Sequence, residues 1–293
     1  MNAAIARLWI ALIVRSAGWS ARTRQRLANI MGLLAWLAVV PRRRIARANL
    51  RACFPHESAR EQRRCSQQLF CNAVRAALDY GVLWTASAQD IRQFVRVQGL
   101  EHLTRHADTP LILLAPHFVG LDAGGMRLAV ERRCVSIYAR QSNPVWDETL
   151  RRGRARFNEP VLIARRGFDL RTALRSMRAG LPFYYLPDMD SGPGNSIFVP
   201  FFGVEAATLP MVSRLARSLD ARVLMTVTEQ TAQGYVLHIE PPWEDFPGAS
   251  IEEDTARMNR EIERWALRLP DQYLWTHRRF KTRPPGAAPI YGR

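Results

Sequence analysis

The sequence predicts an α/β fold, in which helices flank a central mixed, mostly parallel sheet and a membrane-associated helical region precedes it. Two kinds of segment carry this prediction. Residues 111–115 and 181–186 are short apolar runs next to prolines, which is typical of strands buried on both faces of a sheet. Segments with apolar residues at helical spacing alternate with these runs, and such alternation is typical of α/β domains.

The remaining elements are predicted from periodicity, capping residues and turn residues. Residues 222–228 and 234–240 alternate as two strands would, with a short turn at Gly234 between them. Ser250 and Glu253 have the spacing of a capping box, which predicts the start of a helix. Helices are expected over residues 57–80, 169–179, 208–219 and 250–268.

Two apolar stretches, residues 3–14 and 27–40, open the sequence. Neither has the ~20 apolar residues that a membrane-spanning helix needs. Arginines and tryptophans border them, which suits helices that lie in a leaflet with anionic lipid. These residues are Arg22, Arg24, Arg26, Arg42, Arg43, Arg44, Arg47 and Arg51, with Trp9, Trp19 and Trp36. We expect a membrane-associated region over residues 1–45 and a main domain over residues 46–293; a buried hairpin packed on that domain is the alternative.

The composition is that of a folded but strongly basic chain. Its 293 residues include 42 Lys and Arg against 26 Asp and Glu, for a net charge of +16. Such a charge favours acidic partners: nucleic acid, anionic lipid or an acidic carrier protein. Nucleic-acid binding is disfavoured, because the charge is scattered and no motif for it is present. The four cysteines have no metal-ligand spacing and are expected to be reduced thiols.

His117 is the first candidate for chemistry, because it closely follows the predicted strand 111–115. In open α/β sheets, functional sites gather at the carboxyl ends of strands. Asp122 lies five residues further on. If the chain turns at Gly120, the Asp122 carboxylate can accept a hydrogen bond from one ring nitrogen and leave the other as a general base.

The spacing between His117 and Asp122 is weak evidence by itself, because His56 and Glu61 share it. That second pair lies in a polar stretch without a preceding strand, so we expect only a solvated helix start there. The preceding strand, rather than the spacing, selects His117. A structural histidine with satisfied hydrogen bonds is the alternative.

Asp188 follows the predicted strand 181–186 as His117 follows the earlier strand. If the two strands are parallel neighbours, both side chains emerge at the same edge of the sheet. Asp188 is then a second carboxylate partner, or it organises the loop through Gly192 and Gly194. A turn carboxylate that binds its own backbone is the alternative.

Four arginines fall between these two strands: Arg140, Arg154, Arg165 and Arg166. As a group they are candidate clamps for phosphate, because guanidinium groups bind phosphate oxygens in pairs. Any one of them taken alone is better explained as solvated surface.

With these residues in view, the sequence resembles the secondary (late) acyltransferases of lipid A biosynthesis, the lauroyl/myristoyl transferase group of the lysophospholipid acyltransferase-like superfamily. The resemblance covers nearly the whole chain. It is carried by R-x4-A-N-L-x3-C-F-P at 44–55, A-P-H-F-V-G-L-D at 115–122, Y-A-R-Q-S-N-P at 138–144, R-G-R at 152–154, P-D-M-D-S-G-P at 187–193, F-V-P-F-F-G at 198–203 and Q-Y-L-W-T-H-R-R-F-K-T-R-P at 272–284.

The resemblance implies an enzyme at the cytoplasmic face of the bacterial inner membrane. It would transfer a lauroyl- or myristoyl-type chain from acyl-acyl carrier protein to the hydroxyl of a 3-hydroxyacyl chain on a lipid A precursor. His117 and Asp122 would be the catalytic H-x4-D/E pair, with Asp188 as a further catalytic residue. The candidates for substrate binding are Arg140, Asn143, Arg154 and Arg166.

The same resemblance implies no cofactor and no metal. We expect acyl carrier protein, the lipid A precursor and inner-membrane lipid as partners, and no nucleic acid. An acyltransferase for another glycerolipid or glycolipid is the alternative, followed by a basic, non-enzymatic protein that binds nucleic acid.

Overall fold

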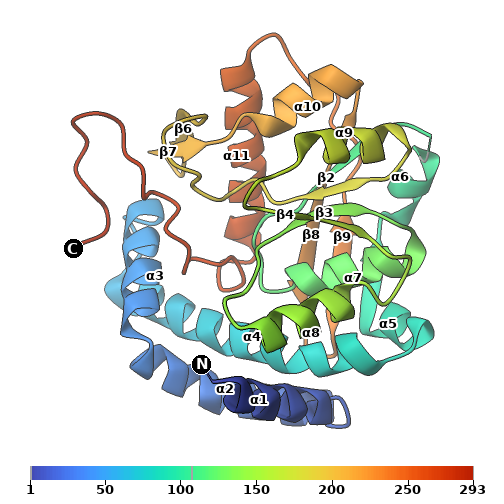
Figure 1. Cartoon of the computed structure of the whole chain (residues 1–293). Coiled ribbons are helices and arrows are strands. Elements are labelled where there is room, and N and C mark those ends of the chain that lie inside the picture. Colours follow the sequence, from blue (N-terminus) through green and yellow to red (C-terminus); the bar gives the residue numbers. More distant parts are fainter. Residues whose placement is uncertain (1, 107, 293) are drawn as a thin grey trace.

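The computed structural model describes residues 2–106 and 108–292, and its centre is a seven-stranded sheet in the order β1-β9-β8-β2-β5-β3-β4 (Figure 1). Neighbouring strands are parallel except β8 and β9, which form an antiparallel hairpin. The predicted mixed, mostly parallel sheet is therefore confirmed. The strands are β1 (Val95–Gln98), β2 (Leu111–Leu114), β3 (Val135–Tyr138), β4 (Val161–Ala164), β5 (Phe183–Tyr185), β8 (Arg222–Gln230) and β9 (Tyr235–Ile239); β6 (Ile197–Phe201) and β7 (Val204–Thr208) form a separate antiparallel pair.

Helices cover both faces of the sheet, and β2 shows how the core is divided between them. Ile112 and Leu114 pack into one cluster with residues of α9, α10 and α11, whereas Leu111 and Leu113 pack into another with residues of α5, α6 and α7. All four side chains are buried, as predicted for a strand covered on both faces. These helices are α5 (Ala88–Phe94), α6 (Leu100–Arg105), α7 (Leu121–Glu131), α9 (Leu170–Arg178), α10 (Met211–Leu219) and α11 (Ile251–Arg268).

Two predicted helix starts differ from the structure in detail. The helix expected from residue 208 begins at Met211, because residues 204–208 pair with β6 as strand β7. At the start of α11, Ser250 accepts the Glu253 N–H at 3.2 Å, but the Glu253 carboxylate does not accept the Ser250 backbone N–H, so the box is incomplete. The Ser250 hydroxyl donates to Glu252 instead.

His56 and Glu61, the second pair with the same spacing, behave as predicted. Glu61 forms a complete capping box with Ser58 at the start of α4 (Ala59–Thr85), and His56 is exposed just before it. The shared spacing of this pair therefore reflects helix capping.

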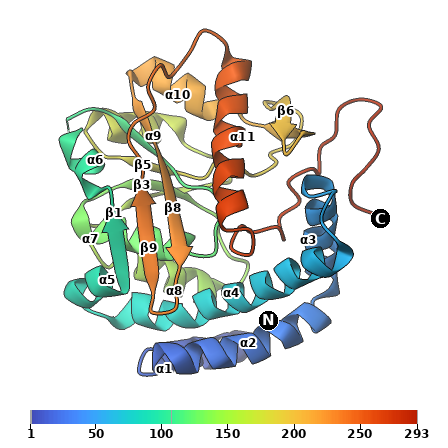
Figure 2. The same cartoon turned by 180° about the vertical axis from the view of Figure 1, so that it is seen from behind.

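The first helices, α1 (Ala3–Ser16) and α2 (Ala21–Ala38), pack against α4 on the side away from the sheet (Figures 1 and 2). A buried ion pair joins α2 to α4, because Arg24 of α2 lies 2.7 Å from Asp79 of α4. Asp79 also binds Arg75 of its own helix at 2.8 Å. Close backbone contact also requires glycine: a Cβ atom on Gly32 would lie 2.4 Å from the Cα of Cys71. The first two helices are thus a fixed part of the molecule.

The outer side of α1 and α2 is apolar and exposed. Of the large apolar side chains that are exposed in the described residues, all but Leu170 and Leu267 lie between residues 5 and 39. Among the helices of residues 2–106 and 108–292, none combines the length and the apolar character that crossing a bilayer requires. The expected division at residue 45 falls inside α3 (Val40–Cys53).

Two of the residues expected to face lipid do not. Trp36 is buried, and its indole N–H donates to Ser66 at 3.0 Å. Arg24 is buried in the ion pair with Asp79 because α2 turns it inward against α4. Arg22, Arg26 and Trp9 are exposed, so the basic and indole border is smaller than the sequence suggested.

Candidate active site

His117 lies just beyond the carboxyl end of β2, with its backbone held on both sides. The N–H of Ala115 donates to the carbonyl of Tyr185 at 2.8 Å, and the N–H of Leu274 donates to the carbonyl of His117 at 2.8 Å. Its side chain is 15% exposed. His117 therefore has a fixed backbone and a ring that solvent still reaches.

Asp188 is the carboxylate that binds His117. Because β2 and β5 are parallel neighbours, Asp188 emerges beside His117, as the sequence predicted. Its Oδ1 lies 2.7 Å from Nδ1 of the ring, and its Oδ2 accepts the His117 backbone N–H at 3.0 Å. The carboxylate can only accept, so Nδ1 carries the proton and Nε2 is the nitrogen left for a substrate.

The electrostatics of this pair favour an ionised carboxylate. Burial would raise the pKa of Asp188, whose side chain is 1% exposed. The adjacent His117 and the hydrogen bonds that it donates outweigh burial and hold the pKa of Asp188 well below its usual range. Asp188 is thus a fixed negative charge next to the His117 ring.

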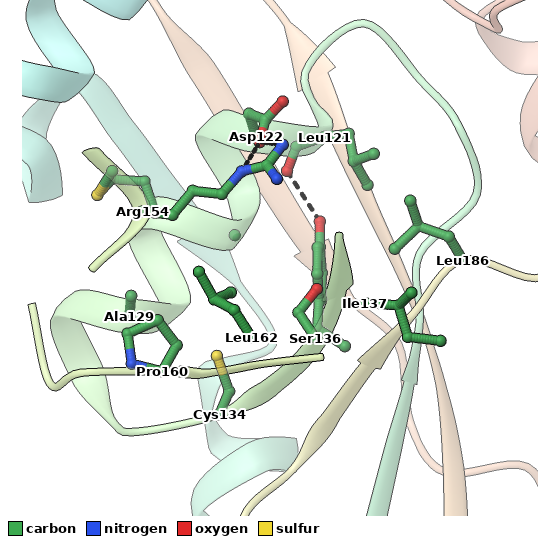
Figure 3. Close-up of a pocket in the computed structure, with 13 residues that line it drawn as sticks. Leu121, Asp122, Ala129, Cys134, Ser136, Ile137, Arg154, Pro160, Leu162 and Leu186 are labelled. Carbon is green, nitrogen blue, oxygen red and sulfur yellow. Dashed lines mark hydrogen bonds and ion pairs between the residues drawn. The ribbon is translucent and has the colours of Figure 1, made fainter. Parts of the chain in front are cut away.

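Asp122 has other partners, so the predicted hydrogen bond from Asp122 to His117 is wrong. Its Oδ1 lies 2.7 Å from Nη2 of Arg154 (Figure 3). Its Oδ2 accepts the hydroxyl of Tyr80. The cause is local: α7 begins at Leu121, and its first turn directs Asp122 toward α4 and α8 (Pro144–Arg154). A cluster of Tyr80, Asp122 and Arg154 results.

Gly120 serves a different purpose from the expected one. Its φ of −82° is available to any residue. A Cβ atom there would lie 2.5 Å from the carbonyl oxygen of Thr228 on β8. Glycine is needed because the backbone passes close to the neighbouring strand, not because the chain turns Asp122 back to His117.

The Tyr80–Asp122–Arg154 cluster keeps one protonation state at neutral pH. The Asp122 carboxylate raises the pKa of Arg154 above its ordinary value. Burial, followed by the charge of Asp122, raises the pKa of Tyr80 well above its ordinary value. Both donors stay protonated, so the cluster is a fixed polar support between α4, α7 and α8.

The segment that follows α11 completes the site. Residues 272–282, here called the closing segment, run beside the loop that carries His117, with Phe118 paired to Tyr273. Asn49 of α3 donates to the carbonyl of Trp275 at 2.6 Å and to that of His277 at 2.7 Å. The sequence showed this segment only as a marker of resemblance, because nothing local indicates what its backbone pairs with.

Within the closing segment, His277 touches the candidate base. The rings of His277 and His117 meet edge to face, with centroids 4.7 Å apart. Burial, together with the charge of His117, lowers the pKa of His277 to about 4, so its ring is neutral at neutral pH. His277 therefore adds no charge beside His117.

The loop after β5 also holds the closing segment. Asp190 accepts the backbone N–H of Thr282 at 2.6 Å and its hydroxyl at 2.9 Å. Asp188 and Asp190, both from P-D-M-D, thus bind His117 and the closing segment respectively. The alternation of the two acids was a signal for this double role that sequence reasoning did not use.

A groove of about 380 Å³ opens beside His117. Most of its wall is apolar, and Arg165 contributes the guanidinium group. The lining residues are His117, Ile137, Ala139, Arg165, Phe168, Tyr185, Leu186, Pro187, Met189, Ser191, Leu209 and Met211. The groove can therefore hold an aliphatic chain next to a base and a cation.

A smaller pocket of about 60 Å³ adjoins the groove and shares Ile137 and Leu186 with it (Figure 3). Asp122 and Arg154 line it on one side, and its far end is lined by apolar side chains, among them Ala129, Cys134 and Leu162. An apolar chain in the groove meets this pocket behind the Ile137 and Leu186 side chains.

The predicted binding residues are not among those that line the groove beside His117. Arg140 is exposed and lies 3.5 Å from the hydroxyl of Tyr138. Asn143 caps α8 by accepting two backbone N–H groups. Arg166 is exposed in the turn before α9, and its neighbour Arg165 lines the groove instead. Arg154 is assembled with another predicted site residue, Asp122.

A histidine oriented by a buried carboxylate, at the carboxyl edge of an α/β sheet and next to an apolar groove, is the arrangement of an enzyme that activates a hydroxyl beside an aliphatic substrate. The comparisons with known proteins agree with that class. The family model of the bacterial lipid A biosynthesis acyltransferases matches residues 3–282. The chain belongs to this family and is an acyltransferase.

Curated relatives cover most of the chain. A lipid A biosynthesis palmitoleoyltransferase of Escherichia coli is 32% identical over 90% of this chain and 87% of its own length. A lauroyltransferase of the same organism is 32% identical over 91% of this chain and 88% of its own length. A myristoyltransferase of Escherichia coli is 32% identical over 86% of this chain and 79% of its own length. Equal identity to three enzymes named for different acyl chains leaves the chain length open.

A solved structure, the 1-acyl-sn-glycerophosphate acyltransferase of Thermotoga maritima, is a more distant match. It is 15% identical, with a TM-score of 0.38, over 85% of this chain and 98% of that chain.

Proposed function

We propose that this acyltransferase moves a fatty acyl chain of lauroyl or myristoyl type from acyl-acyl carrier protein to the hydroxyl of a 3-hydroxyacyl chain on a lipid A precursor, with His117 as the general base. The hydrogen bond between Asp188 Oδ1 and His117 Nδ1 supports the proposal most directly, because it leaves Nε2 as the basic nitrogen beside the groove.

In the proposed reaction, Nε2 of His117 takes the proton of the acceptor hydroxyl while that oxygen attacks the thioester carbonyl. The resulting tetrahedral oxyanion collapses, the carbon–sulfur bond breaks, and the thiolate leaves with the proton that His117 returns. Asp188 keeps the proton on Nδ1 and stabilises the charged ring in between. The carboxylate that we infer to orient the base is thus Asp188, with Asp122 supporting Arg154.

The substrate class follows from the walls of the groove. Apolar side chains such as Ile137, Phe168 and Met211 suit the aliphatic chain. Arg165 is the member of the predicted group of phosphate-binding arginines that lines the groove. We therefore propose that it binds a phosphate of the acceptor. Arg140 and Arg166, both exposed, are candidates for contact with the acidic carrier protein.

The exposed apolar face of α1 and α2 supports a position on the membrane. Leu8, Ile30 and Leu34 are 71%, 62% and 59% exposed. Apolar helices of this kind lie in the interface of a bilayer. We propose that the enzyme docks through this face at the cytoplasmic side of the inner membrane, where both lipid acceptor and carrier are accessible.

Purified enzyme tests the assignment with acyl-acyl carrier protein as donor and a tetra-acylated lipid A precursor as acceptor. His117→Ala should lower kcat/KM by about 10²–10⁴-fold. His56→Ala is the matched control, because His56 is exposed and has the same spacing to an acid, and it should keep the parent rate. Parent activity in His117→Ala would refute the base, whereas mass spectrometry that finds no change in lipid A of a deletion strain would refute the substrate.

A further inference from the structure

A polar cavity of about 480 Å³ lies beside α2 and shares no lining residue with the groove. It is built by α2, α4, the turn between β8 and β9, and the residues after α11. The lining residues are Arg22, Gln25, Arg26, Gln68, Asn72, Gln230, Thr231, Ala232, Asp271 and Gln272. The proposed transfer reaction gives this cavity no role.

The amides in the cavity wall are bound to the protein itself. Gln272 donates to the carbonyl of Gln230 at 3.0 Å, and its side-chain oxygen accepts the Gln230 N–H at 2.7 Å. Gln25 accepts from Arg75 at 2.8 Å and donates to Asn29 at 2.8 Å. These bonds fix the wall before any ligand binds, so an occupant would meet a rigid site.

The guanidinium groups of Arg22 and Arg26 are different, because neither has a side-chain or carbonyl partner in residues 2–106 and 108–292. Asp271 is the carboxylate of the lining, and it forms no ion pair with either arginine within the described chain. Two free cationic donors at a preformed polar cavity suit an anion with several oxygens.

Further positive charge lies behind the wall. Arg24 and Arg75 share the single carboxylate of Asp79, so the buried cluster has one positive charge in excess. Nη2 of Arg75 is buried and has no hydrogen-bond partner in the described chain. An anion in the cavity would be attracted by this excess as well as by Arg22 and Arg26.

The position of the two arginines on α2 indicates where the anion comes from. Residues 22, 26, 30, 33 and 37 are spaced by three or four and so form one stripe along the helix. The stripe begins with Arg22 and Arg26 and continues with Ile30, Leu33 and Leu37, which are 62%, 43% and 53% exposed. When a helix lies in the interface of a bilayer, its basic residues are at the level of the phosphates of the lipid headgroups.

We propose that this cavity binds the phosphate of an anionic lipid headgroup, held by Arg22 and Arg26 while the apolar part of the same stripe enters the acyl layer. This inference rests on the proposed membrane contact of α1 and α2. It adds a headgroup site, distinct from the catalytic groove, that selects the lipid on which the enzyme docks.

Vesicle binding by the full-length enzyme tests the headgroup site. Wild type should bind vesicles of phosphatidylcholine with phosphatidylglycerol more tightly than vesicles of phosphatidylcholine alone. Arg22→Gln with Arg26→Gln should weaken binding to the anionic vesicles by about 30-fold, from ~1 kcal/mol per arginine near an anionic surface. Thermal unfolding should be unchanged, since neither side chain has a partner to lose.

The matched control removes the same charge at the opposite end of the molecule. Arg171 and Arg178 are exposed on α9, far from α1 and α2 (Figure 1). Arg171→Gln with Arg178→Gln should change anionic binding by less than about 2-fold, because screening limits their reach to a Debye length of ~8 Å. Equal losses in the two double variants would overturn the proposal in favour of a general charge effect.

Two further arms separate the lipid source and the underlying docking. Inorganic phosphate should displace bound enzyme no better than chloride at equal ionic strength; a specific effect of phosphate would point to a soluble anion and overturn the lipid assignment. Leu33→Gln with Leu37→Gln should weaken binding to both kinds of vesicle. If vesicle binding is unchanged, the membrane contact proposed for α2 is wrong. The chemistry is tested separately, because transfer by His117→Ala is measured with an acceptor dissolved in detergent, where no membrane is present.

Discussion

Asp188 holds His117 twice: its Oδ1 lies 2.7 Å from Nδ1 of the ring, and its Oδ2 accepts the backbone N–H of the same residue at 3.0 Å. One carboxylate therefore fixes both the tautomer of the proposed base and the backbone that carries it. Because Asp188 binds the ring, we expect a change at Asp188 to affect the proposed catalysis through His117.

Asp188→Asn keeps the size of the side chain and removes its charge. We expect kcat/KM to fall by about 10²–10⁴-fold, because the ring loses both its fixed tautomer and the partner of its charged form. A variant that keeps the parent kcat/KM would contradict the orienting role.

The same pair should make stability depend on pH. The folded-state pKa of Asp188 is lowered from its ordinary value of 3.8. The pair therefore contributes stability that is fully present above about pH 4 and is lost as the pH falls through the folded-state pKa. The difference in free energy of unfolding between wild type and Asp188→Asn should shrink from neutral pH toward about pH 3. A difference that stays constant with pH would contradict the contribution of ionised Asp188 to stability.

Asp122→Asn should behave differently from Asp188→Asn. Its ion pair with Arg154 is about one-third exposed, with side chains 30% and 33% accessible, so we expect a loss of roughly 1–2 kcal/mol in stability. Activity should fall less than in Asp188→Asn, because Asp122 acts through the position of Arg154 and α8. A loss of kcat/KM equal to that of Asp188→Asn would instead show that Asp122 acts on His117.

The buried ion pairs of α2 and α4 should matter more than similar pairs on the surface. Asp79→Asn leaves Arg24 and Arg75 without their carboxylate, which should cost about 3–5 kcal/mol in the free energy of unfolding. Glu148→Gln is the matched control, because Glu148 also binds two arginines but is 41% exposed. That change should cost much less by urea unfolding, because solvent screens an exposed ion pair; similar losses in the two variants would contradict the account.

Ile137 separates the groove from the small pocket, so it is a candidate determinant of acyl chain length. Ile137→Ala should raise the ratio of kcat/KM for longer over shorter acyl donors by about 10-fold, the effect of one or two methylenes in an apolar pocket. Ile163→Ala, in the buried core of the neighbouring strand, is the control for destabilisation and should leave the ratio unchanged. An unchanged ratio in Ile137→Ala would rule out this wall.

The sequence was sufficient for the parts of the fold that local periodicity encodes. The run at 111–115 is a buried strand because its alternate side chains fill both core clusters, and the hairpin around Gly234 formed where alternation predicted it. The meeting of His117 and Asp188 was also within reach, since it needed only that two strands ending in the same pattern be neighbours.

The rest depended on contacts that spacing does not encode. Asp122 was expected at His117, but the first turn of α7 gives it to Arg154, which comes from a helix after the next strand. Trp36 and Arg24 had the sequence context of lipid-facing residues, yet the packing of α2 on α4 buries them. These outcomes depend on which helix packs against each side chain. The residues adjacent in the sequence to Asp122, Trp36 and Arg24 do not encode that packing.

The hold of Asp190 on Thr282 has a consequence for how activity arises during synthesis. The closing segment leaves the ribosome after all seven strands of the central sheet. The sheet and the loop that carries His117 can therefore form before the closing segment is available to pack against them. A nascent or prematurely terminated chain that ends before residue 272 would then have His117 and Asp188 but lack the backbone bond from Leu274 to His117. We therefore expect competence for acyl transfer only once the closing segment docks, which delays the reaction until the chain has folded.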